Sequence, residues 1–335
     1  MTDLATPPLR GTDMLDAPPV DASDGAGVVA LAAAEAVAPT WLGITVPDLA
    51  WKRRWELVIA AWGVAAVAVY LTAGGNLDPY LSLTGLFVGF LVGLTGMGGG
   101  ALMTPILIIF FGFQPTMAVG TDVTYAGVTK IIGSWRHWRR GSVDWPLALW
   151  LAAGSVPASL LGVAAVNYVK HHYGDLIDSI LYRAIGSALL AVGLLLVVRV
   201  LMRIGKEHRR ENIAMSTRRK VLTVALGASA GFVIGLTSVG SGTFLGVILI
   251  LFYPLTTDRI VGTDVFHAMI LLLATGLAQI SAGNVNLWMV AALLIGSIPG
   301  VVIGSHLTVR APTRVLRLCL AAVLFASGLA LLQKA

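Results

Sequence analysis

The stretch GLTGMGGGALMTP, from Gly93 to Pro105, holds five glycines and a proline between two long apolar runs. Glycine and proline are the weakest helix formers, so this stretch predicts an interruption in a helix. Unpaired backbone groups are not tolerated against lipid, because each costs several kcal/mol. If the chain spans a membrane, the interruption must be buried in protein or line a cavity.

Composition supports a membrane protein. The 335 residues are 57% hydrophobic and 12% charged, with a mean hydropathy of +0.84, whereas soluble domains carry about 25% charged residues. This composition predicts an all-α polytopic membrane protein and argues against a soluble helical protein, whose helices need polar faces. The net charge of +6 fits short basic loops on the cytoplasmic side of a membrane better than a nucleic-acid surface.

Apolar segments are expected at 55–73, 81–97, 99–112, 118–135, 146–169, 178–201, 219–238, 242–254, 261–281, 287–307 and 313–333. Region 81–112 is too long for one span at about 1.5 Å per residue, and its halves are short. Each glycine-broken pair is therefore either two short spans or a re-entrant hairpin. The only cysteine, Cys319, lies in the last segment, which excludes an intrachain disulfide, and it is expected to fill the core.

The basic clusters predict the orientation. Lys and Arg gather at 52–54, 136–140, 199–220 and 310–317, and all four can be placed on the cytoplasmic side at once. We expect a disordered cytoplasmic tail (1–50, with an interfacial helix as an option), an extra transmembrane helix (51–80), a first repeat (81–202), a basic cytoplasmic linker (203–218) and a second repeat (219–335). The N-terminus would be cytoplasmic, and the protein would lie in the inner membrane.

An internal duplication underlies the two repeats. Residues 89–162 align without a gap to residues 231–304, with 24 identities. GFLVGLTGMGGG matches GFVIGLTSVGSG, and VGTDV occurs in both halves. Each repeat holds five apolar segments, an odd number, so the basic loops give the two repeats opposite orientations. Inverted repeats with discontinuous helices are typical of secondary transporters, which bind solute near the membrane midplane.

The two glycine clusters are the first candidate site. Free amide groups at a helix N-terminus attract anions, and glycine lets an anion approach the backbone. We therefore expect a small oxyanion to bind between Gly98, Gly99 and Gly100 in one repeat and Gly240, Ser241 and Gly242 in the other, with Ser241 adding a hydroxyl donor. Gly89 and Gly93 are expected to serve close helix packing instead.

Ionisable residues inside the predicted spans are the second candidate feature. Asp122 and Asp264, each after a threonine (Thr121 and Thr263), occupy equivalent places in the two GTDV motifs. They are expected to cap the start of the helix or to act as intramembrane carboxylates that take up protons, and these roles are compatible.

Two basic side chains complete the candidate substrate-binding set. Lys130 either extends its ammonium toward the inner interface or supplies the counter-charge for an anion. His267 is more typical of a hydrogen-bonded packing residue than of a titrating one.

These motifs resemble the TauE/SafE family of sulfite exporters. GMGGGALMTPIL, from Gly96 to Leu107, resembles its signature G-x-G-G-G-x-x-x-x-P-x-L, and the stretches AVGTDV (118–123) and GSVDW (141–145) are similar to further family motifs. The resemblance covers about residues 80–333. It implies two repeats, no cofactor, and export of small, mostly sulfur-containing anions.

The sequence departs from the family pattern at several positions. The resemblance carries Gly98, Gly99, Gly100 and Pro105 over to the first signature, whereas the second copy has Ser241 in place of a glycine and Val247 in place of the proline. Many family members have a serine where this chain has Asp122 and Asp264. Two carboxylates would repel an anion unless they are protonated, which favours proton coupling.

The leading hypothesis is a secondary transporter, an exporter of a small anion such as sulfite or an organosulfonate, working by alternating access. The sequence contains no G-x-x-x-x-G-K-[ST] motif, so coupling to a proton or substrate gradient is expected rather than to ATP. The alternatives are an anion channel, a membrane subunit that carries no solute and, remotely, an intramembrane serine hydrolase built on Ser241 and His267. The expected partners are a small anionic solute and membrane lipid, with no nucleic acid, no metal and no cofactor; a homodimer stays open.

Overall fold

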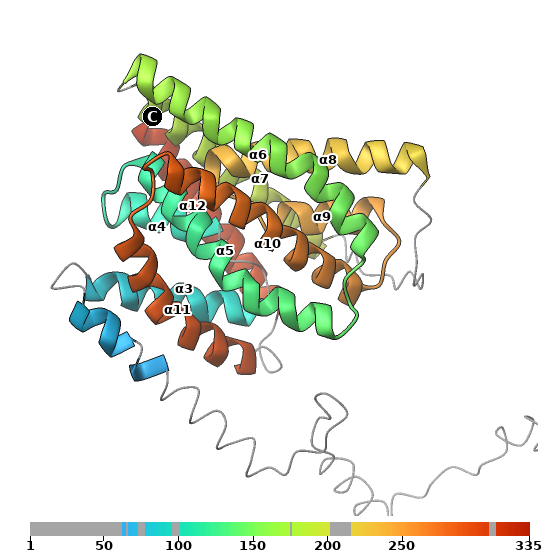
Figure 1. Cartoon of the computed structure of the whole chain (residues 1–335), viewed down its shortest axis with the longest axis horizontal. Coiled ribbons are helices and arrows are strands. Elements are labelled where there is room, and N and C mark those ends of the chain that lie inside the picture. The colour runs from blue at the N-terminus through green and yellow to red at the C-terminus, as the bar shows by residue number, and fades with distance from the viewer. Residues whose placement is uncertain are drawn as a thin grey trace, which may run out of the picture. The chain divides into compact units, whose positions relative to one another are not determined.

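The computed structural model describes residues 62–64, 66–72, 78–95, 101–174, 176–201, 216–307 and 313–335. Within these ranges the regular structure is entirely helical (Figure 1). The named helices are α3 (Pro79–Thr95), α4 (Met103–Ile109), α5 (Pro115–Arg139), α6 (Trp145–Tyr173), α7 (Leu176–Leu201), α8 (Thr217–Thr237), α9 (Phe244–Phe252), α10 (Thr257–Ser281), α11 (Leu287–Leu307) and α12 (Thr313–Lys334). The predicted tail, most of the linker, and Gly98, Gly99 and Gly100 lie outside the described residues.

Six of the described helices are long and apolar enough to cross a membrane: α6, α7, α8, α10, α11 and α12. Each lies within a few residues of a predicted apolar segment, because an uninterrupted apolar run of about 20 residues forms a membrane-length helix. Helix α5 is also long, but Asp122, Lys130 and the basic residues of its last turn lower its hydropathy. The prediction of an all-α polytopic membrane protein is confirmed.

The helix boundaries repeat with the same spacing as the sequence. Helix α5 spans Pro115–Arg139 and α10 spans Thr257–Ser281, so both ends of α10 lie 142 residues after those of α5. The same spacing separates the last residues of α3 and α8, Thr95 and Thr237. The alignment of residues 89–162 with 231–304 therefore corresponds to equivalent secondary structure.

Each repeat packs its first helix on the third long helix of the other repeat: α3 lies along α11, and α8 lies along α6 (Figure 1). Glycine permits backbone contact at equivalent points. A Cβ on Gly89 would lie 2.4 Å from the carbonyl oxygen of Ser297, and one on Gly231 would lie 2.1 Å from that of Ser155. Small residues spaced by four are the usual device for such contact in membranes. The packing role expected for Gly89 is confirmed.

Equivalent helices also pack on each other, and they run antiparallel. Along α5, Gly127 lies beside Leu272 of α10, and the later residue Gly133 lies beside the earlier Val265. Helices α7 and α12 show the same reversal, because Gly186 contacts Gly328 and Leu332 whereas Gly193 contacts Phe325. Within each of the pairs α5–α10 and α7–α12, the two helices thus run in opposite directions.

The interrupted helix of the second repeat is fully described. Helix α8 ends at Thr237, Ser238 has a positive φ of 61°, Gly240 has a φ of 99°, and α9 begins only at Phe244. A side chain at φ 99° is strained, which is why glycine stands at this point of the turn. Helix α9 has nine residues, about 14 Å, and is too short to cross a bilayer alone.

One sequence-based expectation about the core was wrong. Cys319 is exposed on α12 rather than buried. Because nearly every residue of α12 from Leu318 to Leu332 is apolar, its composition does not distinguish the side that packs on α7 from the side that would face lipid. The tryptophans at the start of α6 and the end of α5 are also partly exposed, in keeping with interface positions.

Candidate functional site

Lys130 connects the two repeats at the turn between α8 and α9. Its Nζ donates a hydrogen bond of 3.2 Å to the carbonyl oxygen of Ser241. Lys130 lies in the central part of α5 and is only 8% exposed. The side chain therefore does not extend to an interface, and its other expected role, as the counter-charge for an anion, stays a prediction.

The turn itself has spare hydrogen-bond donors. Ser241 is 1% exposed, and its Oγ has no hydrogen-bond partner among the described residues. The amides of Gly240, Ser241 and Gly242 likewise donate no hydrogen bond to any described residue. Buried donors without partners are costly, so the Ser241 hydroxyl is a feature of this turn that the contacts of the described residues do not explain. The partner cluster predicted in the other repeat, Gly98 to Gly100, lies outside the described residues.

Asp122 is held by donors from both repeats. Its Oδ2 accepts hydrogen bonds from the hydroxyls of Thr104, at 2.5 Å, and Ser238, at 3.0 Å. The backbone amide of Thr104 adds a third donor to the same carboxyl group. Asp122 is the eighth residue of α5 and Thr104 is the second of α4. The expectation that Asp122 and Asp264 cap the start of their own helices is wrong, because α5 begins at Pro115 and α10 at Thr257. The carboxylate of Asp122 instead caps the neighbouring short helix α4.

Asp264, the equivalent residue of the second repeat, lacks these donors. Its carboxyl group accepts no hydrogen bond from the described residues, and its Oδ1 is buried without a partner. The position equivalent to Thr104 is Gly246, and a Cβ there would lie 3.5 Å from Asp264 Oδ2. Lys130 and Arg199, at the end of α7, instead attract this carboxylate electrostatically. The duplicated motif therefore produces two different environments.

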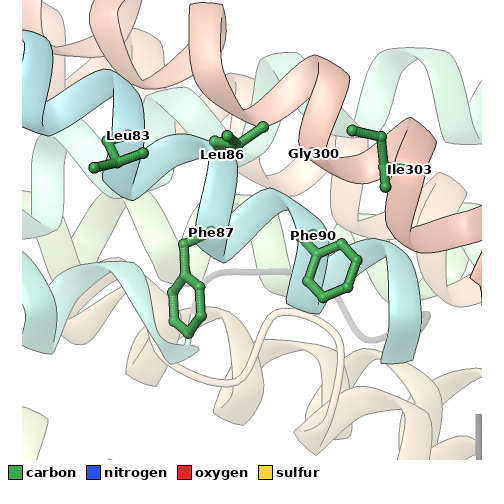
Figure 2. A pocket seen from close by; sticks show the side chains of 6 residues that line it. All are labelled: Leu83, Leu86, Phe87, Phe90, Gly300 and Ile303. Carbon is green, nitrogen blue, oxygen red and sulfur yellow. The ribbon is translucent and has the colours of Figure 1, made fainter.

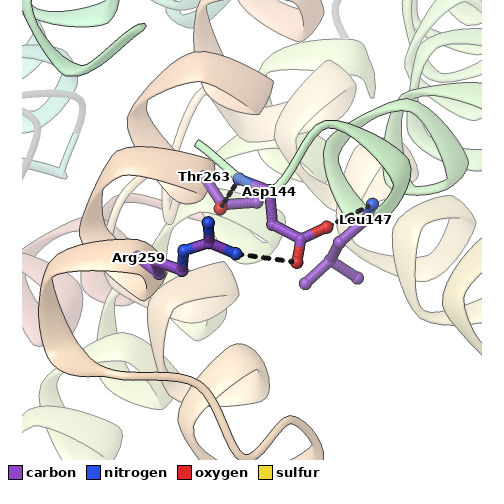
Figure 3. A network of polar contacts seen from close by, with 4 residues as sticks. All are labelled: Asp144, Leu147, Arg259 and Thr263. Carbon is purple, nitrogen blue, oxygen red and sulfur yellow. Dashed lines mark hydrogen bonds and ion pairs between the residues drawn. The ribbon is translucent and has the colours of Figure 1, made fainter. Parts of the chain in front are cut away.

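The threonines before the two aspartates also differ. The hydroxyl of Thr263 accepts a hydrogen bond from the amide of Asp144 at 2.9 Å (Figure 3). Asp144 caps α6 by accepting from the amide of Leu147, and it forms an ion pair of 3.9 Å with Arg259 (Figure 3). Thr263 thus fastens the α5–α6 loop to α10. Thr121 keeps a buried hydroxyl without a partner among the described residues.

His267 does not meet Ser241. Its Nε2 lies 2.7 Å from Ser155 Oγ, so it joins α10 to α6, and its Nδ1 has no hydrogen bond that meets ordinary geometry among the described residues. The duplication places Tyr125 and Ser297 at the positions equivalent to His267 and Ser155, but Ser297 Oγ has no hydrogen-bond partner among the described residues. The histidine is therefore a packing residue between helices, as its surroundings predicted, and the dyad of Ser241 with His267 that a hydrolase needs does not form.

A groove of about 300 Å³ lies between α3 and α11 (Figure 2). It is lined only by apolar residues and a glycine: Leu83, Leu86, Phe87, Phe90, Gly300 and Ile303. Phe87 and Leu83 are exposed there. The lining has no donor for a polar solute, and none of the described candidate residues lines the groove, so it is not the site expected from the sequence.

The structure thus brings together Lys130, Ser241 and Asp264, with Asp122 close by. Thr263 and His267 instead form hydrogen bonds that join helices. Sequence reasoning missed Thr104, Ser238 and Arg199. Thr104 lies inside the first glycine-rich signature and Ser238 inside the second, so their polar character amid apolar residues was the available signal. Arg199 was counted only as part of a basic loop.

Comparisons with known proteins identify the family of this chain. Residues 81–331 match the family model described as Sulfite exporter TauE/SafE. The chain is 39% identical over 251 residues to the probable membrane transporter protein YjnA of Bacillus subtilis, covering 75% of this chain and 98% of that one. It is also 24% identical to YdhB of the same organism over 69% of this chain and 90% of that one, and 27% identical to MJ0441 of Methanocaldococcus jannaschii over 51% and 61%, both described as probable membrane transporter proteins. No solved structure matches the chain. The chain belongs to the TauE/SafE sulfite exporter family of membrane transporters.

Proposed function

We propose that this protein is a secondary transporter that exports a small anion, of the class of sulfite or an organosulfonate, by alternating access. The observation that carries the proposal is the turn at Gly240–Gly242. It combines unpartnered amides, the free Ser241 hydroxyl and the Lys130 ammonium in one buried place. Donors that surround a cation and are shielded from water favour an oxyanion. The sulfur chemistry of the solute rests on the family alone.

The arrangement of the repeats supports alternating access. The antiparallel pairs α5–α10 and α7–α12 are what two repeats of opposite membrane orientation would form. Each outer pair, α3 with α11 and α8 with α6, takes one helix from either repeat. A rocking of these two pairs about the central α5–α10 pair would expose the turn to one side and then to the other. The basic clusters favour an inner-membrane protein with a cytoplasmic N-terminus.

An anion channel is the second candidate function. A channel and a carrier differ in counterflow: only a carrier accelerates uptake of labelled solute when unlabelled solute is present on the far side. Proteoliposomes loaded with unlabelled sulfite and supplied with labelled sulfite test this directly. We expect acceleration, and a flux that the internal sulfite does not change would exclude alternating access.

The anion site is tested by binding. Thermal stabilisation of the purified protein is measured against sulfite, sulfonates, sulfate and carboxylates. We expect at least one sulfur oxyanion to stabilise the protein, and Ser241→Leu to abolish this effect by filling the turn. Ser281→Leu, at an exposed position on the last turn of α10, is the matched control. Normal binding by Ser241→Leu would contradict the proposed site.

A further inference from the structure

We propose that Asp264, and not Asp122, is the carboxyl group that takes up a proton when an anion binds beside Lys130. One proton then accompanies each anionic charge across the membrane. This inference rests on the proposed function, because it assumes that the solute is an anion held at the turn between α8 and α9.

The first argument is the balance of buried charge. Lys130 is attracted by both Asp264 and Asp122, and Asp264 is attracted by both Lys130 and Arg199. In the ionised state, these two carboxylates and two cations balance one another when no solute is present. An anion that binds to Lys130 adds one uncompensated negative charge to this cluster. Isolated buried charge is expensive, so the binding of one proton to a carboxylate restores the balance.

The second argument decides which carboxylate accepts that proton. The hydroxyls of Thr104 and Ser238 donate hydrogen bonds to Asp122, and such bonds stabilise the ionised carboxylate. Asp264 is 7% exposed and receives no such bond from the described residues. Gly246 stands at the position equivalent to Thr104 and has no hydroxyl to donate. Protonation of Asp264 therefore weakens no hydrogen bond, whereas protonation of Asp122, even at its unpartnered Oδ1, would make its Oδ2 a poorer acceptor for the two hydroxyls that bond to it.

The charged groups around Asp264 control its protonation. Lys130 faces it from α5 and Arg199 from α7, while Arg317 of α12 repels Arg199. Helix α9 carries no charged residue, and α6 carries charged residues or histidine only in its last turn. On α10 itself, His267 is bonded to Ser155. When the anion occupies Lys130, Asp264 loses part of its main attraction and binds a proton, becoming a neutral carboxylic acid; when the anion leaves, the proton is released.

The experiment measures proton uptake on anion binding with the purified full-length protein. Methanesulfonate is the probe, because its charge does not change in the pH range used. Uptake is read with a pH indicator in weak buffer, and affinity is read by thermal stabilisation. We expect about one proton per bound anion in the natural protein and a Kd that rises about tenfold per pH unit where Asp264 loses its proton. Asp264→Asn should bind without uptake and without pH dependence, whereas Asp122→Asn should keep both.

A second variant tests the same inference if Asp264→Asn does not fold. Gly246→Thr places at α9 the hydroxyl that Thr104 supplies at α4, and its Cβ would be in ordinary contact with Asp264. The new donor should hold Asp264 ionised, so uptake should fall and methanesulfonate should bind at least several-fold more weakly at equal pH. Unchanged uptake in Gly246→Thr would overturn the inference.

The remaining outcomes separate this inference from the proposed function. Uptake that persists in Asp264→Asn, or that is lost in Asp122→Asn while the anion still binds, overturns the assignment. Binding of methanesulfonate or sulfite by the natural protein without any uptake also overturns it and leaves the anion site standing. If no sulfur oxyanion, sulfate or carboxylate stabilises the natural protein, the proposed function fails, and the inference fails with it.

Discussion

Gly231 of α8 and Ser155 of α6 are in backbone contact: a Cβ on the glycine would lie 2.1 Å from the carbonyl oxygen of the serine. Gly231→Ala must therefore push the two helices apart. We expect a loss of about 1–3 kcal/mol, the usual cost of overpacking. A lowered Tm of the protein in detergent, followed by intrinsic fluorescence, would report it.

The matched control for Gly231→Ala is Gly133→Ala, where the new Cβ would lie 3.4 Å from a methyl group of Val265. That side chain needs to move very little, so the Tm should change little. Gly89→Ala, at the equivalent contact with Ser297, should behave as Gly231→Ala does. A Gly231→Ala protein as stable as Gly133→Ala would show that α6 and α8 do not touch as described.

Replacement of Lys130 should weaken the binding of anions. A hydrogen bond or ion pair that involves a charged group contributes about 1.5–3 kcal/mol, so Lys130→Gln should raise the Kd for sulfite or a sulfonate by roughly 10- to 100-fold. Lys170→Gln is the control, because Lys170 lies in the last turn of α6 and bonds to Asn284 rather than to the α8–α9 turn. Equal affinities of the two variants would remove Lys130 from the site.

Much of the fold follows from the sequence for simple physical reasons. Long apolar runs predict the spanning helices, and the constant spacing of GTDV and of the glycine motifs predicts the duplication. The turn at Gly240 to Gly242 was predictable, because glycine there serves a backbone angle that other residues avoid. Even Gly89 could be given its packing role, since small residues four apart indicate close helices.

The differences between the repeats could not be predicted in the same way. Asp122 and Asp264 stand in the same motif, but their environments depend on residues from other helices, namely Thr104 and Ser238 for one and Gly246 for the other. A short pattern carries no information on such distant neighbours. The exposure of Cys319 failed to be predicted for a related reason: in a membrane, lipid-facing and core-facing positions are equally apolar.

Loss of Ser238 should destabilise the fold through Asp122. Ser238→Ala removes a donor from a fully buried carboxylate, and we expect a loss of about 1.5–3 kcal/mol. Thermal unfolding measures it, with Ser187→Ala as the control, because the exposed Ser187 bonds only to a carbonyl of its own helix. Thr104→Val together with Ser238→Ala should not be additive, since both act on one group. Additive losses would mean that the two hydroxyls serve different partners.

Asp144 should tolerate asparagine better than alanine. Its carboxylate caps α6, while its ion pair with Arg259 is long and partly exposed, and such pairs contribute at most about 1 kcal/mol. Asparagine caps a helix about as well as aspartate, and Asn286 does so at the equivalent place before α11. Asp144→Ala should thus lower the Tm clearly more than Asp144→Asn. Equal losses would assign the stabilisation to the ion pair instead.

The opposite orientation of the repeats can be tested at two equivalent positions. Arg139 and Ser281 are exposed residues at the last turns of α5 and α10, and these helices run antiparallel. In a Cys319→Ser background, we expect Ser281→Cys to react with a membrane-impermeant maleimide added to intact spheroplasts. Arg139→Cys, beside the basic cluster that favours the cytoplasm, should react only after permeabilisation. Labelling of both cysteines from the same side would place the two repeats in one orientation. The proposed alternating access, in which the turn between α8 and α9 opens first to one side of the membrane and then to the other, would then lose its structural basis.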